Sequence, residues 1–271
     1  MDVRKALLGL TLLLLFGNGV AVAADFDKGL KAAQSGDFKT ALIEWTPLAE
    51  QGDVDAQYNL GVIYDNGYGV PQNDRTAVKW FTLAAEQRHA VAQFYLGAMY
   101  DNGSGVLEND KTAVKWYTLA AERGYASAQY NLGVMYANGE GVPENDKTAV
   151  KWYTLAAEQG DAVAQTKLGH MFKNGEGVPQ NDRAAKRWYT LAAEQGHADA
   201  QSHLGIMYAY GLGALKDKRR AYMWWNLAGY NGSEFAIDMK DKLLKKKMSP
   251  ADISKAQEMS IRCLESNYTD C

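Results

Sequence analysis

The chain has 271 residues, of which 47% are hydrophobic and 23% are charged, and its formal net charge at pH 7 is −3. A charge this small and slightly acidic argues against a protein that binds nucleic acid or an anionic membrane. With only 4 His and 2 Cys, the chain has few of the side chains from which a metal centre or a disulfide framework is built.

Residues 1–24 have the pattern of a secretory signal peptide. Arg4 and Lys5 precede an apolar run over residues 6–16, which is too short to span a bilayer comfortably. A small-residue motif, Ala21-Val22-Ala23, fits cleavage after position 23 or 24. We therefore expect an exported protein, with the periplasm as the first destination and no transmembrane segment in the mature chain. The alternative interpretation is an uncleaved anchor helix.

Residues 25–52 are predicted to form a divergent, tetratricopeptide-like helix pair. The turn between its two helices is Ser35-Gly36-Asp37, since Gly and Asp favour tight turns. Pro47 lies inside the second predicted helix and removes one internal hydrogen bond. We expect a kink or a break there.

Five near-copies of one repeat occupy residues 53–232, with predicted boundaries 53–88, 89–124, 125–160, 161–196 and 197–232. The landmarks that recur every 36 residues include Trp80, Trp116, Trp152, Trp188 and Trp224. A fixed period of this size indicates stacked supersecondary units. One unit cannot bury its own apolar faces, so stability accumulates from the interfaces between neighbours.

Each copy reads as two amphipathic helices joined by a Gly-rich loop. In the first copy, Ala56, Leu60 and Ile63 share one helical face. Gly61 in the middle of that helix costs about 1 kcal/mol relative to Ala, so we expect a close approach between helices to compensate. An Asp is predicted to cap the N-terminus of each second helix, at Asp74, Asp110, Asp146, Asp182 and Asp217.

The repeat resembles the Sel1-like repeat family, which is related to tetratricopeptide repeats. In the third copy the residues that carry the resemblance are Ala128, Leu132, Gly133, Tyr136, Gly139, Gly141, Val142, Ala149, Trp152, Tyr153, Ala156, Ala157 and Gly160. The resemblance implies an all-α fold, an α/α solenoid of stacked helix pairs whose first helices line the concave side. Terminal helices are expected to cap its two ends.

Residues 233–271 are predicted to be the C-terminal capping helices. Ser233 is expected to cap a helix to Lys247, and Ser249 with Pro250 to begin a last helix through about Leu264. Cys263 and Cys271 are expected to pair, since disulfides are the usual state of cysteines in exported proteins. The basic region from Lys216 to Lys247 is interpreted as a solvated helix terminus.

Five positions on each first helix differ between the copies and are the candidates for contact with a partner. They turn from aromatic and acidic in the early copies to basic and His-containing in the later ones. The candidates are Tyr58, Asn59, Val62, Asp65, Phe94, Tyr95, Asp101, Asn102, Tyr130, Asn131, Lys167, His170, Lys173, His203 and Tyr210.

The aromatic candidates have two interpretations of equal weight. Aromatic side chains are enriched at protein interfaces, but Tyr58, Phe94 and Tyr130 could instead pack between neighbouring repeats. A second aromatic series on the first helices is assigned to the core, namely Tyr64, Tyr100, Tyr136, Phe172 and Tyr208.

No catalytic, cofactor-binding or metal site is predicted. The chain contains no phosphate loop, no G-x-S-x-G and no H-E-x-x-H motif. His170 and His203 lie on similar faces of adjacent repeats and could approach each other, but two His without a carboxylate or Cys make a weak metal site. Ser202 and His203 are neighbours on one helix and do not face each other.

The sequence therefore predicts a non-enzymatic exported adaptor or scaffold that binds a protein or an extended peptide in the concave groove. One alternative is a module that binds peptidoglycan or another glycan, with Tyr95 beside Asp101 and Asn102. A weaker alternative is a β-lactam hydrolase, an activity associated with cysteine-rich relatives. Those relatives carry a Cys pair in each repeat, which this chain does not.

Overall fold

The computed structural model describes residues 24–244 and 247–271, so the predicted signal peptide lies outside the described residues except for Ala24. The described chain is entirely helical, which confirms the all-α class. Its elements are α1 (Phe26–Gln34), α2 (Phe38–Glu50), α3 (Val54–Asn66), α4 (Asp74–Glu86), α5 (Ala90–Asn102), α6 (Asp110–Ala121), α7 (Ala126–Asn138), α8 (Asp146–Glu158), α9 (Ala162–Asn174), α10 (Asp182–Ala193), α11 (Ala198–Tyr210), α12 (Lys218–Tyr230), α13 (Glu234–Met239), the π-helix η1 (Lys240–Leu244) and α14 (Pro250–Glu265).

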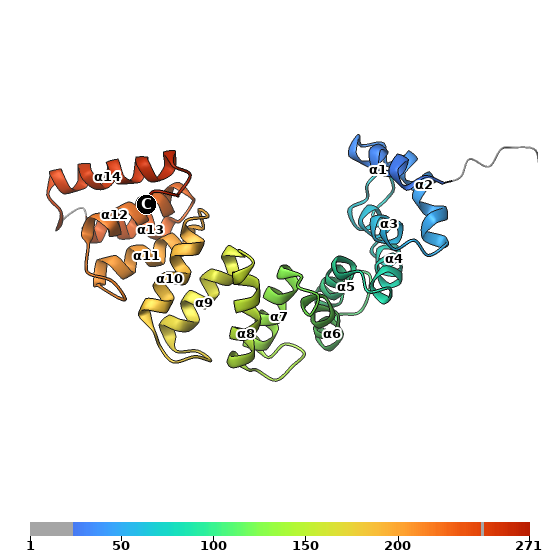
Figure 1. The fold of residues 1–271 in the computed structure, drawn as a ribbon, viewed down its shortest axis with the longest axis horizontal. Helices are drawn as coiled ribbons and strands as arrows, with labels where there is room; N and C mark the ends of the chain where they lie inside the picture. Colours follow the sequence, from blue (N-terminus) through green and yellow to red (C-terminus); the bar gives the residue numbers. More distant parts are fainter. Residues whose placement is uncertain (1–23, 245–246) are drawn as a thin grey trace, which may run out of the picture.

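Consecutive helices pack as antiparallel pairs, and the pairs stack into an arc whose two ends rise on the same side (Figure 1). The first helices of the repeats, α3, α5, α7, α9 and α11, lie along the inner side of the arc. The second helices, α4, α6, α8, α10 and α12, lie along the outer side. We call the inner side the inner face. The concave placement that the family resemblance implied for the first helices is therefore the one observed.

The glycine in the middle of each first helix lies against an aromatic ring of the second helix. A Cβ atom on Gly133 would lie 2.6 Å from Cδ1 of Tyr153, and one on Gly97 would lie 2.7 Å from Cδ1 of Tyr117. Tyr117 is fully buried, and Tyr153 is almost so. The expected close approach is confirmed, and it explains why a residue with poor helix propensity recurs in every repeat.

A buried glutamine joins neighbouring repeats at each boundary. Nε2 of Gln129 donates to the carbonyl oxygen of Ala121 in the preceding repeat at 3.0 Å, and its Oε1 accepts from Nε2 of Gln159 at 2.7 Å. The same side-chain amide recurs in the other four repeats, at Gln57, Gln93, Gln165 and Gln201. Each amide is a second donor to a carbonyl in the last turn of the preceding helix, since the carbonyl of Ala121, for example, also accepts from the backbone N–H of Gly124 at 3.0 Å.

One repeat breaks this pattern. Oε1 of Gln93 is buried and has no hydrogen-bond partner. Arg123 occupies the position equivalent to Gln87 and Gln159, whose side chains donate to this oxygen in their own repeats. Leaving a buried acceptor unpaired costs about 1–3 kcal/mol. The missing hydrogen bond to Gln93 therefore makes the second repeat contribute less to the stability of the solenoid than its neighbours do.

The structure corrects the assignment of four helix caps. Asp74, Asp110, Asp146 and Asp182 are the first helical residues, and the Asn before each of them is the N-cap. Oδ1 of Asn145, for example, accepts from the backbone N–H of Thr148 at 3.0 Å. Asn and Asp are equally good caps, and an Asp in the first turn is still favoured by the helix dipole. Asp217 caps α12, as predicted.

The core assignments hold only in part. Of the aromatic series on the first helices, Tyr208 is buried, whereas Tyr64, Tyr100, Tyr136 and Phe172 are only half-buried. The space between the helices is filled instead by the second-helix aromatics that contact the glycines. Helix α2 runs through Pro47 to Glu50, so the chain does not break at that proline.

The C-terminal segment closes the solenoid. Helix α14 packs against α12, and Cys263 and Cys271 form the predicted disulfide, with their Cα atoms 4.8 Å apart. Between these cysteines, the hydroxyl of Tyr268 accepts from Nδ2 of Asn231, which also donates to Oε1 of Gln201. The tail thus ends the series of glutamine contacts. Ser233 and Ser249 are N-caps, as predicted, but the helix after Ser233 ends at Met239 and η1 follows.

We predict that Arg123→Gln stabilises the chain by about 1 kcal/mol, because the new amide can donate to Oε1 of Gln93. The reciprocal change, Gln159→Arg, should destabilise it by a similar amount because it leaves Oε1 of Gln129 unpaired. Urea unfolding followed by circular dichroism measures both. Equal stability of the two variants would contradict this account of the glutamine contacts.

Candidate functional site

The predicted partner-contacting residues all lie on the helices of the inner face. Three of them are well exposed, namely Asn102, Lys167 and Tyr210, and the others are half-buried. A half-buried side chain can pack against its neighbour and still present atoms to a partner. The contacts of each group therefore decide which role dominates.

The aromatic candidates in the first two repeats pack tightly on one another and on the second helices. The ring of Tyr58 stacks on His89 with centroids 4.7 Å apart, and Tyr95 stacks on Phe81 at 5.2 Å. Phe94 lies 5.1 Å from Tyr125 of the next repeat. Burial raises the pKa of Tyr58 to about 12. These contacts support the packing interpretation for Tyr58 and Phe94, and aromatic pairs of this kind stabilise beyond their buried area.

A hollow of about 540 Å³ opens between α7 and α9 on the inner face. Tyr130, Lys167 and His170, all predicted contact residues, line it. It is also lined by three acidic residues that the sequence analysis did not select, Glu144, Asp146 and Glu176. These residues lie in loops and at the start of α8, outside the first helices that were compared. The hollow therefore combines one lysine with several carboxylates around an aromatic wall.

His170 and His203 come together, as the sequence suggested, with ring centroids 4.4 Å apart and perpendicular planes. The structure adds Asp199, which the sequence analysis did not name. Its Oδ2 lies 3.3 Å from Nε2 of His170, and its Oδ1 lies 3.6 Å from Nε2 of His203. Asp199 and His203 are four residues apart on α11, and this spacing was the signal that could have revealed the carboxylate.

Tyr189 of α10 supports both imidazole rings. Its hydroxyl lies 3.1 Å from Nδ1 of His170, and its ring stacks on His203 with centroids 5.0 Å apart. Burial lowers the pKa of His203 to about 4, with the charges of His170 and Lys173 acting in the same direction and Asp199 opposing them. The hydrogen bond from His170 lowers the pKa of the Asp199 carboxyl. His203 is therefore neutral and Asp199 ionised at neutral pH.

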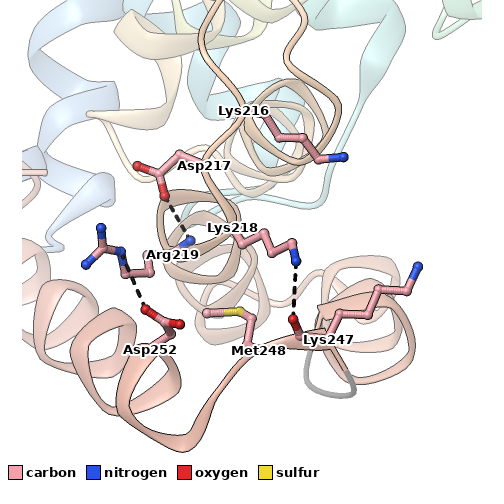
Figure 2. Close-up of a pocket in the computed structure, with 7 residues that line it drawn as sticks. All are labelled: Lys216, Asp217, Lys218, Arg219, Lys247, Met248 and Asp252. Atoms are coloured by element: carbon pink, nitrogen blue, oxygen red, sulfur yellow. Dashed lines mark hydrogen bonds and ion pairs between the residues drawn. The ribbon is translucent and has the colours of Figure 1, made fainter.

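A basic pocket lies where the last repeat meets the C-terminal segment (Figure 2). Two of its four cationic side chains have partners in the chain. Nζ of Lys218 donates to the carbonyl of Lys247 at 3.2 Å, and Nε of Arg219 lies 3.9 Å from Oδ1 of Asp252. The pocket thus joins α12 to the cap. Lys218 and Arg219 lie in the first turn of α12 and not at a helix C-terminus, where the helix dipole would favour cations.

Among the described residues, no helix is long and apolar enough to cross a bilayer.

A family model described as "Sel1 repeat" matches five consecutive segments of the chain, at residues 54–89, 90–125, 126–161, 162–197 and 198–233. None of the curated proteins matches the chain.

Two solved structures share the fold at more than 30% identity. A Sel1 repeat protein from Oxalobacter formigenes is 33% identical and superposes with a TM-score of 0.78, over 88% of this chain and 99% of the other. A protective antigen with an SLR fold, c5321 from uropathogenic Escherichia coli, is 31% identical with a TM-score of 0.76, over 90% of this chain and 57% of the other.

We predict that Phe94→Ala destabilises the chain by about 3 kcal/mol, because it removes a ring packed between two repeats. Tyr210→Ala is the matched control, since 58% of this side chain is exposed and surface changes usually stay within about 0.5 kcal/mol. Thermal and urea unfolding measure both. A loss below about 1 kcal/mol for Phe94→Ala would show that the ring is free for another role.

Proposed function

Because the chain belongs to the Sel1 repeat family, we propose that it is a non-enzymatic, exported adaptor that binds a protein or an extended peptide on its inner face. Sel1 repeat solenoids are typical scaffolds for interactions between proteins, and the fold of this chain is such a solenoid. The partner and the export are the parts of the proposal that experiment must establish.

The observation that carries the proposal is the contrast between a repeated core and a varied inner face. The glycine and glutamine contacts recur from repeat to repeat. At one inner position, by contrast, the five repeats carry Val62, Ala98, Val134, His170 and Ile206. A solenoid needs only its repeating contacts to fold, so variation concentrated on the inner face is what a surface that recognises a particular partner would show.

The hollow between α7 and α9 is the part of the inner face best suited to a polar segment. Lys167 is exposed at its rim, and Glu144 and Glu176 are exposed across from it. Such a mixture of charges can orient a peptide that presents both signs, and exposed charges govern association rate and specificity more than affinity. Tyr130 supplies an aromatic surface against which an apolar side chain could pack.

Export is supported by two observations. The pattern of residues 1–24 is that of a signal peptide, and both cysteines are joined in a disulfide, a bond that persists in oxidising compartments.

The glycan alternative has less support on the inner face. Tyr95 stacks on Phe81, which covers one of its ring faces. Oδ2 of Asp101 accepts from the hydroxyl of Tyr117 at 3.3 Å. Nδ2 of Asn102 donates to the carbonyl of Ala98 at 2.9 Å, so all three side chains proposed to contact a sugar have partners within the chain. A glycan therefore enters only as an outcome of the test below.

The test is photo-crosslinking in the envelope fraction, with a photoreactive amino acid at single positions. Asn138 and Lys167 report on the hollow, and Lys151 and Arg187 on the outer helices α8 and α10 are the matched controls, since all four side chains are exposed. We expect one discrete protein product from the two inner positions and none from the outer ones. With the photoreactive residue at position 138, Lys167→Glu should lower the yield of the crosslinked protein at least about fivefold. The reason is that this variant reverses the charge of the one Lys or Arg side chain that lines the hollow.

Mass spectrometry of the product identifies its class. A product that forms equally from Lys151 and Arg187 would contradict the inner-face assignment. A muropeptide or another glycan in place of a protein would replace the adaptor proposal with the glycan alternative.

A further inference from the structure

The cluster of His170, Asp199 and His203 lies at the boundary between the fourth and fifth repeats, next to the hollow. Among residues 24–244 and 247–271, it is the one group of three His, Cys, Asp or Glu side chains whose ligand atoms all lie within 4.8 Å of one another. His170 comes from α9, and the other two come from α11. The two helices are neighbours on the inner face, so a ligand held by this cluster would bridge two repeats.

From this geometry we infer that His170, Asp199 and His203 form a binding site for a divalent transition-metal ion of the zinc class. Zn²⁺ binds His nitrogen and carboxylate oxygen at about 2.0–2.2 Å, which places two ligands of a tetrahedral ion about 3.4 Å apart. The distances from the carboxylate oxygens to the two Nε2 atoms are 3.3 and 3.6 Å. Small side-chain rotations would bring all three atoms to one ion.

The surroundings of the cluster resemble the outer shell of a metal site. A ligating imidazole normally donates its other N–H to a nearby group that fixes its orientation. With Nε2 of His170 on the ion, its Nδ1–H faces the hydroxyl of Tyr189 at 3.1 Å. The same tyrosine ring stacks on His203 and so limits the rotation of the second ligand.

Among the described residues, neither ring nitrogen of His203 has a hydrogen-bond partner within range. Its Nδ1 is buried without a partner, and its Nε2 lies 3.6 Å from Asp199, beyond hydrogen-bonding distance. Buried polar groups in proteins are nearly always satisfied, and an exception calls for an explanation. A bound ion would supply a partner for Nε2, whereas Nδ1, which would then carry the proton, keeps none in this arrangement.

The solenoid does not need these three residues for its own packing. At the positions equivalent to His170, the other repeats carry Val62, Ala98, Val134 and Ile206. Those equivalent to His203 carry Asn59, Tyr95, Asn131 and Lys167, and those equivalent to Asp199 carry Asp55, Val91, Ser127 and Val163. Three metal-binding side chains therefore converge at one boundary only, and no other repeat carries a His at either of the two His positions.

Three protein ligands leave a coordination position open. Asp199 is the most exposed of the three, with 55% of its side chain accessible, against 30% for His170 and 19% for His203. The open position therefore faces solvent on the inner face, where water or a carboxylate or imidazole of a bound partner can complete the coordination. Binding of the ion itself does not depend on the adaptor proposal, whereas completion of its coordination by a partner's side chain rests on it.

Isothermal titration with ZnCl₂ on the untagged full chain tests the inference. We expect one equivalent of Zn²⁺ bound per chain, and a loss of affinity of at least about tenfold in each of His170→Val, Asp199→Ser and His203→Asn. These variants insert residues that other repeats carry at the same positions, and circular dichroism verifies that they fold. Tyr189→Phe should weaken binding by about 10-fold to 100-fold, as the loss of an outer-shell partner does.

His89→Gln is the matched control, because His89 also faces a carboxylate, Asp55, at 3.6 Å but lacks a third ligand. Its affinity for Zn²⁺ should equal that of the unaltered chain. A second measurement needs no substitution: Co²⁺ should broaden the NMR signals of His170 and His203 and leave those of His89 unchanged. Absence of Zn²⁺ binding, or retention of full affinity in the His203→Asn variant, would overturn the inference.

Discussion

The structure depends on a side-chain amide that closes the end of one helix pair against the next. Gln129 donates to the carbonyl of Ala121 in the preceding repeat and accepts from Gln159 of its own repeat. Its equivalents make both contacts, except Gln93, whose Oε1 has no donor in the described part of the chain. Stacking buries these glutamine side chains, so their donors and acceptors need partners within the chain. Each contact with the preceding repeat thus links two neighbouring units at a fixed place.

The spacing inside each pair follows from a second constraint. The glycine of the first helix admits an aromatic ring of the second, as Gly133 admits Tyr153, at distances that a Cβ atom would forbid. The ring and the small alanines beside it then fill the interior at full density. Because these contacts lie between the two helices, the inner face carries less of the repeated packing, although Tyr58 and Phe94 on it still pack against neighbouring rings. Its positions can therefore diverge, and in the fourth and fifth repeats they diverge towards His170, Asp199 and His203.

Much of the candidate site was predictable, because a repeat places equivalent positions on equivalent faces. Lys167, His170 and Tyr130 were selected by comparing copies, and all three line the hollow. Asp199 and Glu144 were missed for a physical reason. A contact between residues about thirty positions apart depends on how one repeat rotates on the next, and periodicity does not encode that rotation. The aromatics show the same limit, since only their contacts, such as Phe94 with Tyr125, reveal the packing role.

The sequence by itself determined the helix-pair repeat, its family, the all-α class and the pairing of the two cysteines. These follow from local periodicity and from the presence of only two cysteines, and both are properties of the chain read in order. Tertiary structure alone decided which side chains meet across repeat boundaries. It brought the carboxylate of Asp199 within reach of His170 from the preceding repeat, and it placed Phe94 against Tyr125 of the next one. The reason is that such contacts arise from the three-dimensional angle between neighbouring units, which no single repeat contains.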